Sequence, residues 1–159
     1  MPVKTIEEIL KETKIYQILR PKLVTAPPET TLENALALMQ KEKAGYLVVA
    51  DRQLKVVGMF TEREVLMKVL QKGVSLKETL DKYMNKNIRP LSKSDTVGMA
   101  IDVMKDYSVR HIPLVDEQGH MNGVLSIRTI VTFLSELFPT EVFNLPPKAD
   151  QVHETAEGG

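Results

Sequence analysis

The chain of 159 residues contains no cysteine. This absence excludes disulfide bonds, thiolate zinc sites and cysteine nucleophiles. Neither charge is in excess, because 21 Lys and Arg residues balance 21 Asp and Glu residues, so bulk charge gives no argument for a nucleic-acid or anionic-membrane partner. Charged residues also interrupt every apolar run well before the roughly 20 residues that cross a bilayer, and the N-terminal stretch MPVKTIEEILKETK lacks the apolar core of a secretion signal. We therefore expect a cytoplasmic protein with no nucleic-acid partner and no membrane insertion.

No residue pattern in the sequence is typical of an enzyme. The three histidines, at positions 111, 120 and 153, lack the H-x-x-x-H and H-E-x-x-H spacings of metal-binding helices. There is no G-x-S-x-G motif, no P-loop and no G-x-G-x-x-G motif, and acidic residues are scattered over expected helix faces and turns. We therefore expect no catalytic residue, no metal site and no enzymatic activity.

An internal repeat organises the chain. When the sequence is shifted by 65 residues on itself, two stretches align without a gap, and YLVVAD lies over HIPLVD while VVGMFT lies over MNGVLS. Upstream, IYQIL at 15–19 lies over LDKYM at 80–84. Chance does not keep one register over about 50 positions, so we infer a duplication. The aligned identities include Thr31 with Thr96, Ala35 with Ala100, Met39 with Met104, Asp51 with Asp116, Gly58 with Gly123 and Arg63 with Arg128.

Each repeat carries the same series of predicted elements. A short extended piece precedes a helix, two strands joined by a hairpin turn, and a second helix. These elements cover 22–26, 30–43, 46–50, 56–60 and 62–71 in the first repeat, and 87–91, 96–106, 111–115, 121–125 and 127–137 in the second. Thr30 with Glu33 predicts a capping box for the first helix, and Asp95 predicts the N-cap of its counterpart. Gly119 suits the positive φ of a hairpin turn.

The remaining segments flank and join the repeats. A helix is predicted from about residue 5 to residue 19, and a short helix over 76–84 in the linker. After Phe138 the sequence is rich in proline and polar residues, so we expect order to about Leu145 and a mobile tail beyond it. The expected division is an N-terminal helix at 1–13, a first repeat at 14–72, a linker at 73–78, a second repeat at 79–138 and a partly disordered extension at 139–159. One repeat has too small a sheet to bury both faces, so the two repeats should pack together.

The repeated motifs resemble those of a known family. The helix segments TLENALALM and TVGMAIDVM match a T-h-x-x-A-h-x-x-M pattern, where h is an apolar residue, and HIPLVDEQGHMNGVLSIRTIV matches l-P-V-V-D, a turn, G-h-h-S/T and x-R-x-h-h. With both copies in order over about residues 14–138, the chain resembles a tandem pair of cystathionine-β-synthase (CBS) domains, called a Bateman module. This resemblance implies an α/β (α+β) fold in which two β-α-β-β-α repeats pack as a pseudo-two-fold pair. It also implies that an adenine nucleotide (AMP, ADP or ATP) or S-adenosylmethionine binds between the repeats as a regulatory ligand.

The starts of the two second helices are the first candidate ligand contacts. Thr61 and Ser126 occupy the family's Ser/Thr position, where the resemblance implies a contact with ribose or phosphate. Glu64 and Thr129 stand where the family usually has a ribose-binding aspartate, so the first repeat keeps the charge on a longer arm and the second loses it. A plain structural role competes with this interpretation, because Thr61-x-x-Glu64 is also a capping box and Ser126 is a good N-cap.

Basic residues and strand starts supply the other candidates. Arg110 and His111 precede the second repeat's strand, where family members use basic residues on phosphate, although a surface arginine and a half-buried histidine would look the same. The strand starts at Tyr46 and at His111 could read the adenine edge through backbone groups, but an aromatic residue there is more often packing. The expected nucleotide-binding set is therefore Thr25, Tyr46, Leu47, Thr61, Arg63, Glu64, Arg110, His111, Ile112, Pro113, Ser126, Arg128 and Thr129.

Two hypotheses of function remain from the sequence. The first is a stand-alone regulatory, signal-transduction module that binds an adenine nucleotide and acts through a homodimer or through a separate effector enzyme or transporter. The second is a scaffold that keeps the fold without a ligand, which the loss of the acid at Thr129 favours. In both hypotheses the dimer would use apolar residues of the second helices: Val65, Leu66, Val69, Val131, Leu134 and Leu137.

Overall fold

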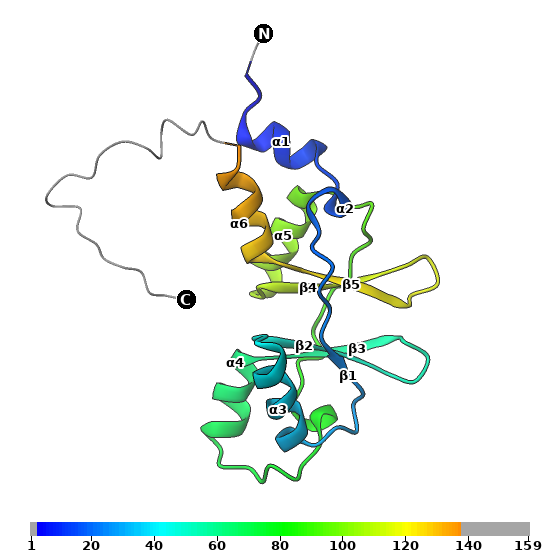
Figure 1. Ribbon diagram of the computed structural model, residues 1–159, viewed down its shortest axis with the longest axis vertical. Helices are drawn as coiled ribbons and strands as arrows, with labels where there is room; N and C mark the ends of the chain where they lie inside the picture. The colour runs from blue at the N-terminus through cyan, green and yellow to red at the C-terminus, as the bar shows by residue number, and fades with distance from the viewer. Residues whose placement is uncertain (1–2, 138–159) are drawn as a thin grey trace, which may run out of the picture.

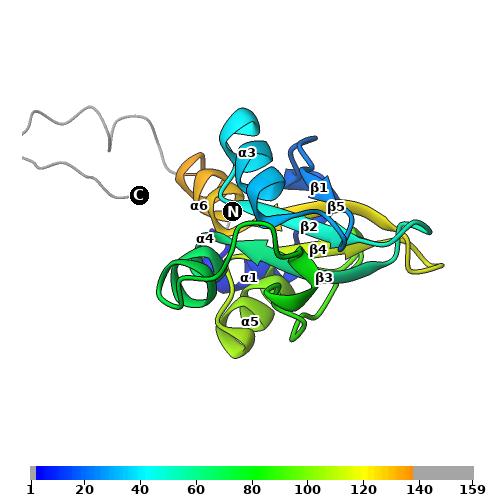
Figure 2. The ribbon, with the colours of Figure 1, turned by 90° about the horizontal axis from the view of Figure 1, so that it is seen from below.

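The computed structural model of the protein describes residues 3–137, so the predicted order to Leu145 and the mobile tail lie outside the described residues. The described chain forms two halves stacked on each other (Figure 1). Each half has a small sheet that faces the sheet of the other half, with its helices on the outer side. Seen along the stack, the two sheets overlap and both hairpin turns project to the same side (Figure 2). The mixed fold of two packed repeats is therefore confirmed.

The first half contains the elements that the first repeat predicts. They are β1 (Thr25–Ala26), α3 (Leu32–Glu42), β2 (Tyr46–Ala50), β3 (Val56–Thr61) and α4 (Glu62–Glu64), which continues as the π-helix η1 (Val65–Leu70). The sheet has the order β1-β2-β3, with β1 parallel and β3 antiparallel to β2. The predicted second helix over 62–71 is thus present, but most of it has π rather than α winding.

The second half repeats this arrangement with a smaller sheet. It contains α5 (Val97–Tyr107), β4 (His111–Val115), β5 (Met121–Ser126) and α6 (Ile127–Ser135). The predicted extended piece at 87–91 is reduced to one parallel bridge between Leu91 and Leu114. Gly119 has the positive φ that the hairpin turn predicts, at +84°. No helix in the part of the chain that the structure describes is long and apolar enough to span a membrane.

The N-cap of each first helix lies one residue later than predicted. Thr31 rather than Thr30 is the N-cap of α3, and its hydroxyl accepts the backbone N–H of Asn34 at 3.2 Å. Thr96 rather than Asp95 caps α5, while the Asp95 carboxylate accepts the N–H of Ser92 at 2.8 Å. Adjacent residues in both places have side chains that can cap a helix, so residue type alone does not decide between them.

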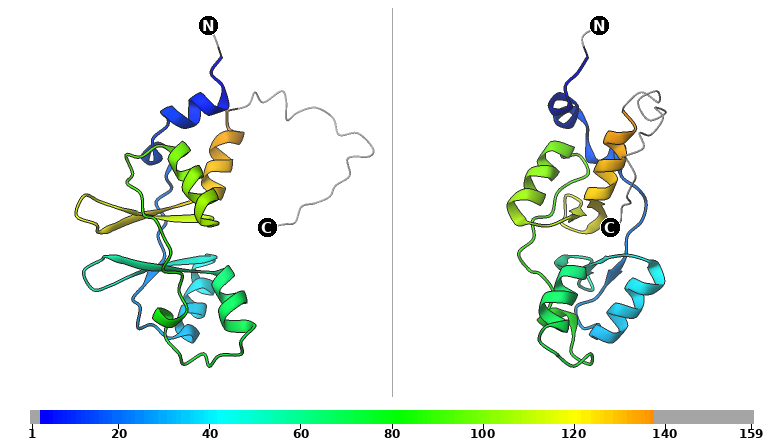
Figure 3. Two further views of the ribbon diagram at one scale, coloured as in Figure 1. Left: turned by 180° about the vertical axis from the view of Figure 1, so that it is seen from behind. Right: turned by 90° about the vertical axis from the view of Figure 1, so that its left-hand side faces the viewer.

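The chain at the start of each repeat packs on the opposite half. The predicted N-terminal helix is two pieces, α1 (Ile6–Glu12) and α2 (Ile15–Ile18), separated by extended residues at 13 and 14. The Ile15 N–H donates to the Asp95 carbonyl at 2.9 Å, so this segment lies against the second half. In the same way the linker, whose predicted helix is only the 3-10 turn η2 (Leu80–Lys82), lies against the first half, where the Leu80 N–H donates to the Thr30 carbonyl at 2.9 Å. The two segments therefore cross between the halves (Figures 1 and 3).

These crossing segments complete the two apolar cores. Ile15 and Leu80, which are equivalent in the repeat, are both fully buried, Ile15 in the core of the second half and Leu80 in the core of the first. Val124 of β5 packs into the core of the first half, so the stacked sheets share apolar contacts. Each half therefore takes core residues from the other repeat, and the crossing joins them.

Candidate functional site

Two aromatic rings meet where the sheets face each other. Tyr46 and His111 are equivalent in the repeat, and their ring centroids lie 4.8 Å apart with a 30° angle between the planes. Tyr46 is 7% exposed, and its hydroxyl donates to the Lys22 carbonyl at 3.4 Å and accepts the Val24 N–H at 3.3 Å. Backbone groups of residues 22 and 24 therefore fix the Tyr46 ring in place. The two rings fill this part of the seam, which is the region where the two sheets face each other.

Burial affects the chemistry of the histidine in this pair. It lowers the pKa of His111 from its ordinary value of 6.5 to about 4, and the positive charge of Arg110 lowers it further in the same direction. The imidazole is therefore neutral at pH 7, where it can donate or accept a hydrogen bond but carries no charge.

The strand ladders place the candidate residues in two equivalent groups. Tyr46 pairs with Thr61 across β2 and β3, and His111 pairs with Ser126 across β4 and β5. The first residue of each second helix also donates its backbone N–H to the residue just before the first strand of the hairpin. The Glu62 N–H donates to the Gly45 carbonyl at 3.1 Å, and the N–H of residue 127 donates to the carbonyl of residue 110 at 2.9 Å. One group therefore contains Tyr46, Thr61 and Glu64, and the other contains Arg110, His111, Ser126 and Thr129.

Glu64 is the only charged side chain that is buried among the described residues, at 6% exposure. Its Oε1 accepts the Thr61 N–H at 2.9 Å and the Thr61 hydroxyl at 2.5 Å, which confirms the reach-back half of the predicted capping box. Within residues 3–137, its Oε2 accepts no hydrogen bond and no Lys or Arg forms an ion pair with it. The carboxylate therefore keeps one oxygen that is free to accept a hydrogen bond from a ligand.

The equivalent position in the second repeat carries no charge. The Ser126 hydroxyl accepts the Thr129 N–H at 3.2 Å, which is an ordinary N-cap, and the two side-chain oxygens lie 3.2 Å apart. Both residues are half-buried. The two groups therefore differ in kind, since one offers a buried anion and the other offers neutral hydroxyls beside a basic pair.

The three candidate arginines are exposed and differ in their contacts. Arg63 Nη1 donates to the Ser108 carbonyl at 3.2 Å, which links α4 of the first half to the C-terminal end of α5 in the second. Arg110 and Arg128 form no ion pair within the described chain. Arg110 is therefore available to an anion, whereas Arg63 already holds a carbonyl at a helix C-terminus.

The other predicted contacts have structural surroundings. Leu47 and Ile112 are fully buried in the cores on the helix side of their sheets. The Thr25 hydroxyl donates to the Val48 carbonyl at 2.7 Å, and the carbonyl of Pro113 accepts the Leu91 N–H at 3.1 Å. These side chains and bonds stabilise the fold, so any ligand contact by them would have to use remaining backbone groups.

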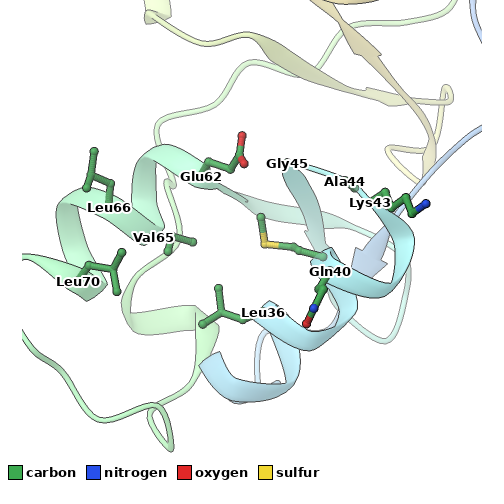
Figure 4. A pocket seen from close by; sticks show the side chains of 10 residues that line it. Leu36, Gln40, Lys43, Ala44, Gly45, Glu62, Val65, Leu66 and Leu70 are labelled. Atoms are coloured by element: carbon green, nitrogen blue, oxygen red, sulfur yellow. The ribbon is translucent and has the colours of Figure 1, made fainter. Parts of the chain in front are cut away.

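The sequence did not predict an open cavity of about 470 Å³ at the surface of the first half. It lies between α3 and the α4–η1 helix, away from the facing sheets (Figure 4). A second cavity of about 410 Å³ is lined by Glu29, Asp51, Arg52 and Gln53. None of the predicted ligand contacts lines either cavity. The residues around the first are Leu36, Met39, Gln40, Lys43, Ala44, Gly45, Glu62, Val65, Leu66 and Leu70. Over residues 3–137, no group of three potential ligands could hold a metal ion.

The family model for the CBS domain matches this chain twice, over residues 15–71 and 80–136. The protein therefore belongs to the CBS domain family, as a tandem pair. An uncharacterized 17.7 kDa protein of Acidianus ambivalens is 30% identical over 125 residues, which cover 79% of this chain and 75% of that one. Inosine-5'-monophosphate dehydrogenase of Aquifex aeolicus is 27% identical over 135 residues, but they cover only 26% of the enzyme. That partial match does not carry the dehydrogenase activity over to this chain.

Solved structures show the same fold. A CBS domain protein from Pyrobaculum aerophilum, complexed with AMP, superimposes with a TM-score of 0.69 at 26% identity, covering 78% of this chain and 97% of that one. The CBS domain pair of protein MJ0100, in complex with 5-methylthioadenosine and S-adenosyl-L-methionine, gives a TM-score of 0.70 at 21% identity, covering 78% of this chain and 97% of that one.

Proposed function

We propose that this CBS pair is a regulatory protein that binds an adenine nucleotide between its repeats. The ribose binds the Glu64 carboxylate, and the phosphate is directed toward Arg110 and His111. The observation that carries this proposal is Glu64 itself, a largely buried acidic residue whose Oε1 is bound by Thr61 and whose Oε2 has no donor within the described chain. Ribose hydroxyls are neutral donors that suit such an oxygen, because each adds a charge-assisted hydrogen bond of about 1.5–3 kcal/mol.

The phosphate end of the proposed site follows from the two groups of residues. The Tyr46–His111 ring contact joins the group that holds Glu64 to the group that holds Arg110. Because His111 is neutral at pH 7, the Arg110 guanidinium supplies the charge and can bind phosphate in a bidentate way. A single nucleotide across the seam can therefore use the acid of one repeat and the base of the other, whereas neither of the two groups of residues has both.

The Pyrobaculum aerophilum structure supports the class of ligand. That protein is complexed with AMP, and it is 26% identical to this chain. AMP is therefore the first ligand to test, with ADP, ATP and S-adenosylmethionine beside it. The cytoplasmic location and a separate effector enzyme or transporter stay predictions.

We also infer that the output passes through a homodimer. The apolar surface that a partner would cover contains Leu66, Leu70 and Val131 on the second helices and Leu137 just after α6, which are between 46% and 64% exposed. The predicted contribution of Val69 is wrong, because Val69 is 2% exposed and belongs to the core of the first half. Light scattering should give twice the mass of 17.9 kDa at micromolar concentration, and a monomer mass would contradict the dimer.

Calorimetry with matched nucleotides tests the ribose contact. The wild-type protein should bind AMP about tenfold more tightly than 2′-deoxy-AMP, and Glu64→Gln should reduce this ratio to about twofold, because one lost hydrogen bond to a charged group costs about 1.5 kcal/mol or more. Glu62→Gln, the same change at an exposed carboxylate two residues earlier, is the control and should keep the wild-type ratio. If no nucleotide binds at millimolar concentration, or if Glu64→Gln leaves the ratio unchanged, the proposal is wrong.

One observation favours a ligand-free scaffold as the second candidate. The Tyr46 and His111 rings fill the part of the seam where they meet, and the cavity of about 470 Å³ lies elsewhere. Sedimentation velocity with and without AMP and ATP separates the two candidates. Assembly that no nucleotide changes, together with no heat of binding, would favour the scaffold.

A further inference from the structure

The second helices of the two repeats are equivalent in sequence position but wound differently. In the second half, α6 is a regular α-helix over Ile127–Ser135. In the first half only Glu62–Glu64 has α winding, and η1 follows as a π-helix. The Gln71 N–H donates to the Leu66 carbonyl at 3.1 Å, five residues back, which is the π pattern. A π segment is rare in proteins and is frequently found at functional sites.

The difference begins at the fourth residue of the capping motif. In the second half the Ser126 hydroxyl accepts the Thr129 N–H, and α winding follows directly. In the first half the Thr61 hydroxyl instead donates a hydrogen bond to the Glu64 carboxylate. Glu64 is also the last residue with α winding before η1 begins. The carboxylate that the ribose would bind is therefore the group that holds the start of the unusual helix.

A ligand at this carboxylate would compete with Thr61. The two hydroxyls of a ribose diol can donate to the two oxygens of one carboxylate. The hydroxyl at Oε2 meets a free acceptor, and the hydroxyl at Oε1 displaces the Thr61 hydroxyl, which can then accept the Glu64 N–H as Ser126 does for Thr129. A change from π to α hydrogen bonding shifts the register by one residue, and one residue is about 100° around an α-helix. Leu66, Met67 and Leu70, which are 53%, 46% and 64% exposed, would then point in new directions.

The helix is also attached to its surroundings at both ends. Arg63 holds the Ser108 carbonyl of the other half, and Lys68 Nζ donates to the Met84 carbonyl of the crossing linker at 3.3 Å. A change of winding therefore reaches both the opposite repeat and the linker. The cavity beside η1, lined by Leu36, Leu66 and Leu70, leaves space for these side chains to turn (Figure 4).

We propose that the segment from Glu62 to Leu70 is the element that transmits nucleotide binding. Capture of ribose by Glu64 converts η1 from π to α winding and re-aims the apolar side chains of the proposed dimer surface. The α6 helix, which already has α winding and has no carboxylate at its start, does not change. This inference rests on the proposed nucleotide site and names how that site acts.

Amide hydrogen exchange tests the inference on the full chain. With AMP at saturation, a peptide covering 62–74 should exchange about tenfold more slowly, because the α-wound helix opens less often, while a peptide covering 127–137 should change less than about twofold. Calorimetry on the same samples reports binding separately. Heat of binding without a change at 62–74, or with equal changes in both peptides, would overturn this inference and leave the nucleotide site standing.

A variant tests the same inference without ligand. Glu64→Thr gives the first repeat the Thr-x-x-Thr start that corresponds to Ser126 and Thr129, so its 62–74 peptide should exchange slowly with or without AMP. Exchange of the ligand-free variant at the wild-type rate would overturn the inference even if AMP does not bind at all. If Glu64→Thr fails to fold, Glu64→Gln serves instead. Its amide oxygen accepts the hydrogen bond of the Thr61 hydroxyl more weakly. The ligand-free exchange rate at 62–74 should therefore lie between the wild-type rate and the slow rate expected of Glu64→Thr, and a wild-type rate would count against the inference.

Discussion

Gly58→Ala should destabilise the protein more than the equivalent change Gly123→Ala. Both glycines lie where a crossing segment passes the sheet. A Cβ at Gly58 would lie 2.8 Å from Met84 Sδ and 3.0 Å from the Asn85 carbonyl oxygen. The Met84 side chain can move, but Asn85 is held by two backbone hydrogen bonds to residue 59, at 3.0 and 2.7 Å. At Gly123 the closest atoms are 3.4 Å away, at the tips of Leu19 and Leu114.

The expected magnitudes follow from these distances. Forcing a methyl group into a packed site typically costs 1–3 kcal/mol, and the lower unfolded-state entropy of alanine offsets about 0.4–1 kcal/mol of that, so Gly58→Ala should lose about 1 kcal/mol of unfolding free energy. Gly123→Ala meets only ordinary contacts, and its lower unfolded-state entropy offsets about 0.4–1 kcal/mol, so its net change should be close to zero. Urea denaturation with unchanged m-values measures both. Equal losses in the two variants, or no loss in Gly58→Ala, would refute the claim that the linker passes the first sheet more tightly than the N-terminal segment passes the second.

Three further predictions concern the seam between the sheets. In calorimetry, Arg110→Ala should weaken the binding of AMP by about 10- to 100-fold and the binding of adenosine hardly at all, because the guanidinium would contact only the phosphate. Equal losses of affinity for the two ligands would show that Arg110 does not bind the phosphate. Asn122→Val gives the second repeat the residue that the first repeat has at Val57. It should raise the unfolding free energy by about 1 kcal/mol in urea titrations, because Asn122 Oδ1 is a buried acceptor without a partner in the described chain. A clear loss of stability would show that this oxygen accepts a stabilising hydrogen bond. The pKa of His111 is about 4 in the folded protein and 6.5 in the unfolded chain, so the unfolded chain binds the proton first as the pH drops. The free energy of unfolding should therefore fall between pH 6.5 and pH 4, by a total of about 3 kcal/mol, and His111→Gln should remove that part of the pH dependence.

Much of the fold could be predicted because it depends on local patterns. The short apolar runs YLVVA and HIPLV, bounded by turn residues, mark strands, and the turn residues fix where the hairpins close. The crossing of the N-terminal segment and the linker could not be predicted in this way. The apolar residues at Ile15 and Leu80 indicate that each segment is buried, but nothing in their spacing says which repeat buries it. Only the long-range contacts of the folded chain decide that.

The candidate site was predictable in its residues but not in their environment. Thr61-x-x-Glu64 predicts a capping box, and the structure forms the bond from the Thr61 N–H to the carboxylate. The burial of Glu64 depends on packing around the helix start, which residue type does not reveal. The Tyr46–His111 contact depends on how two distant strands face each other, and the cavity in the first half depends on the packing of α3 against the α4–η1 helix. Neither has a local signal in the sequence.

A crystal structure of the protein grown with AMP tests the account most directly. We predict one nucleotide at the seam of each chain, with a ribose hydroxyl within hydrogen-bond distance of a Glu64 carboxylate oxygen and the phosphate against Arg110. A structure obtained at saturating AMP that keeps the Tyr46 and His111 rings in contact, with the Glu64 carboxylate bound only by Thr61 and no nucleotide beside it, would contradict the account.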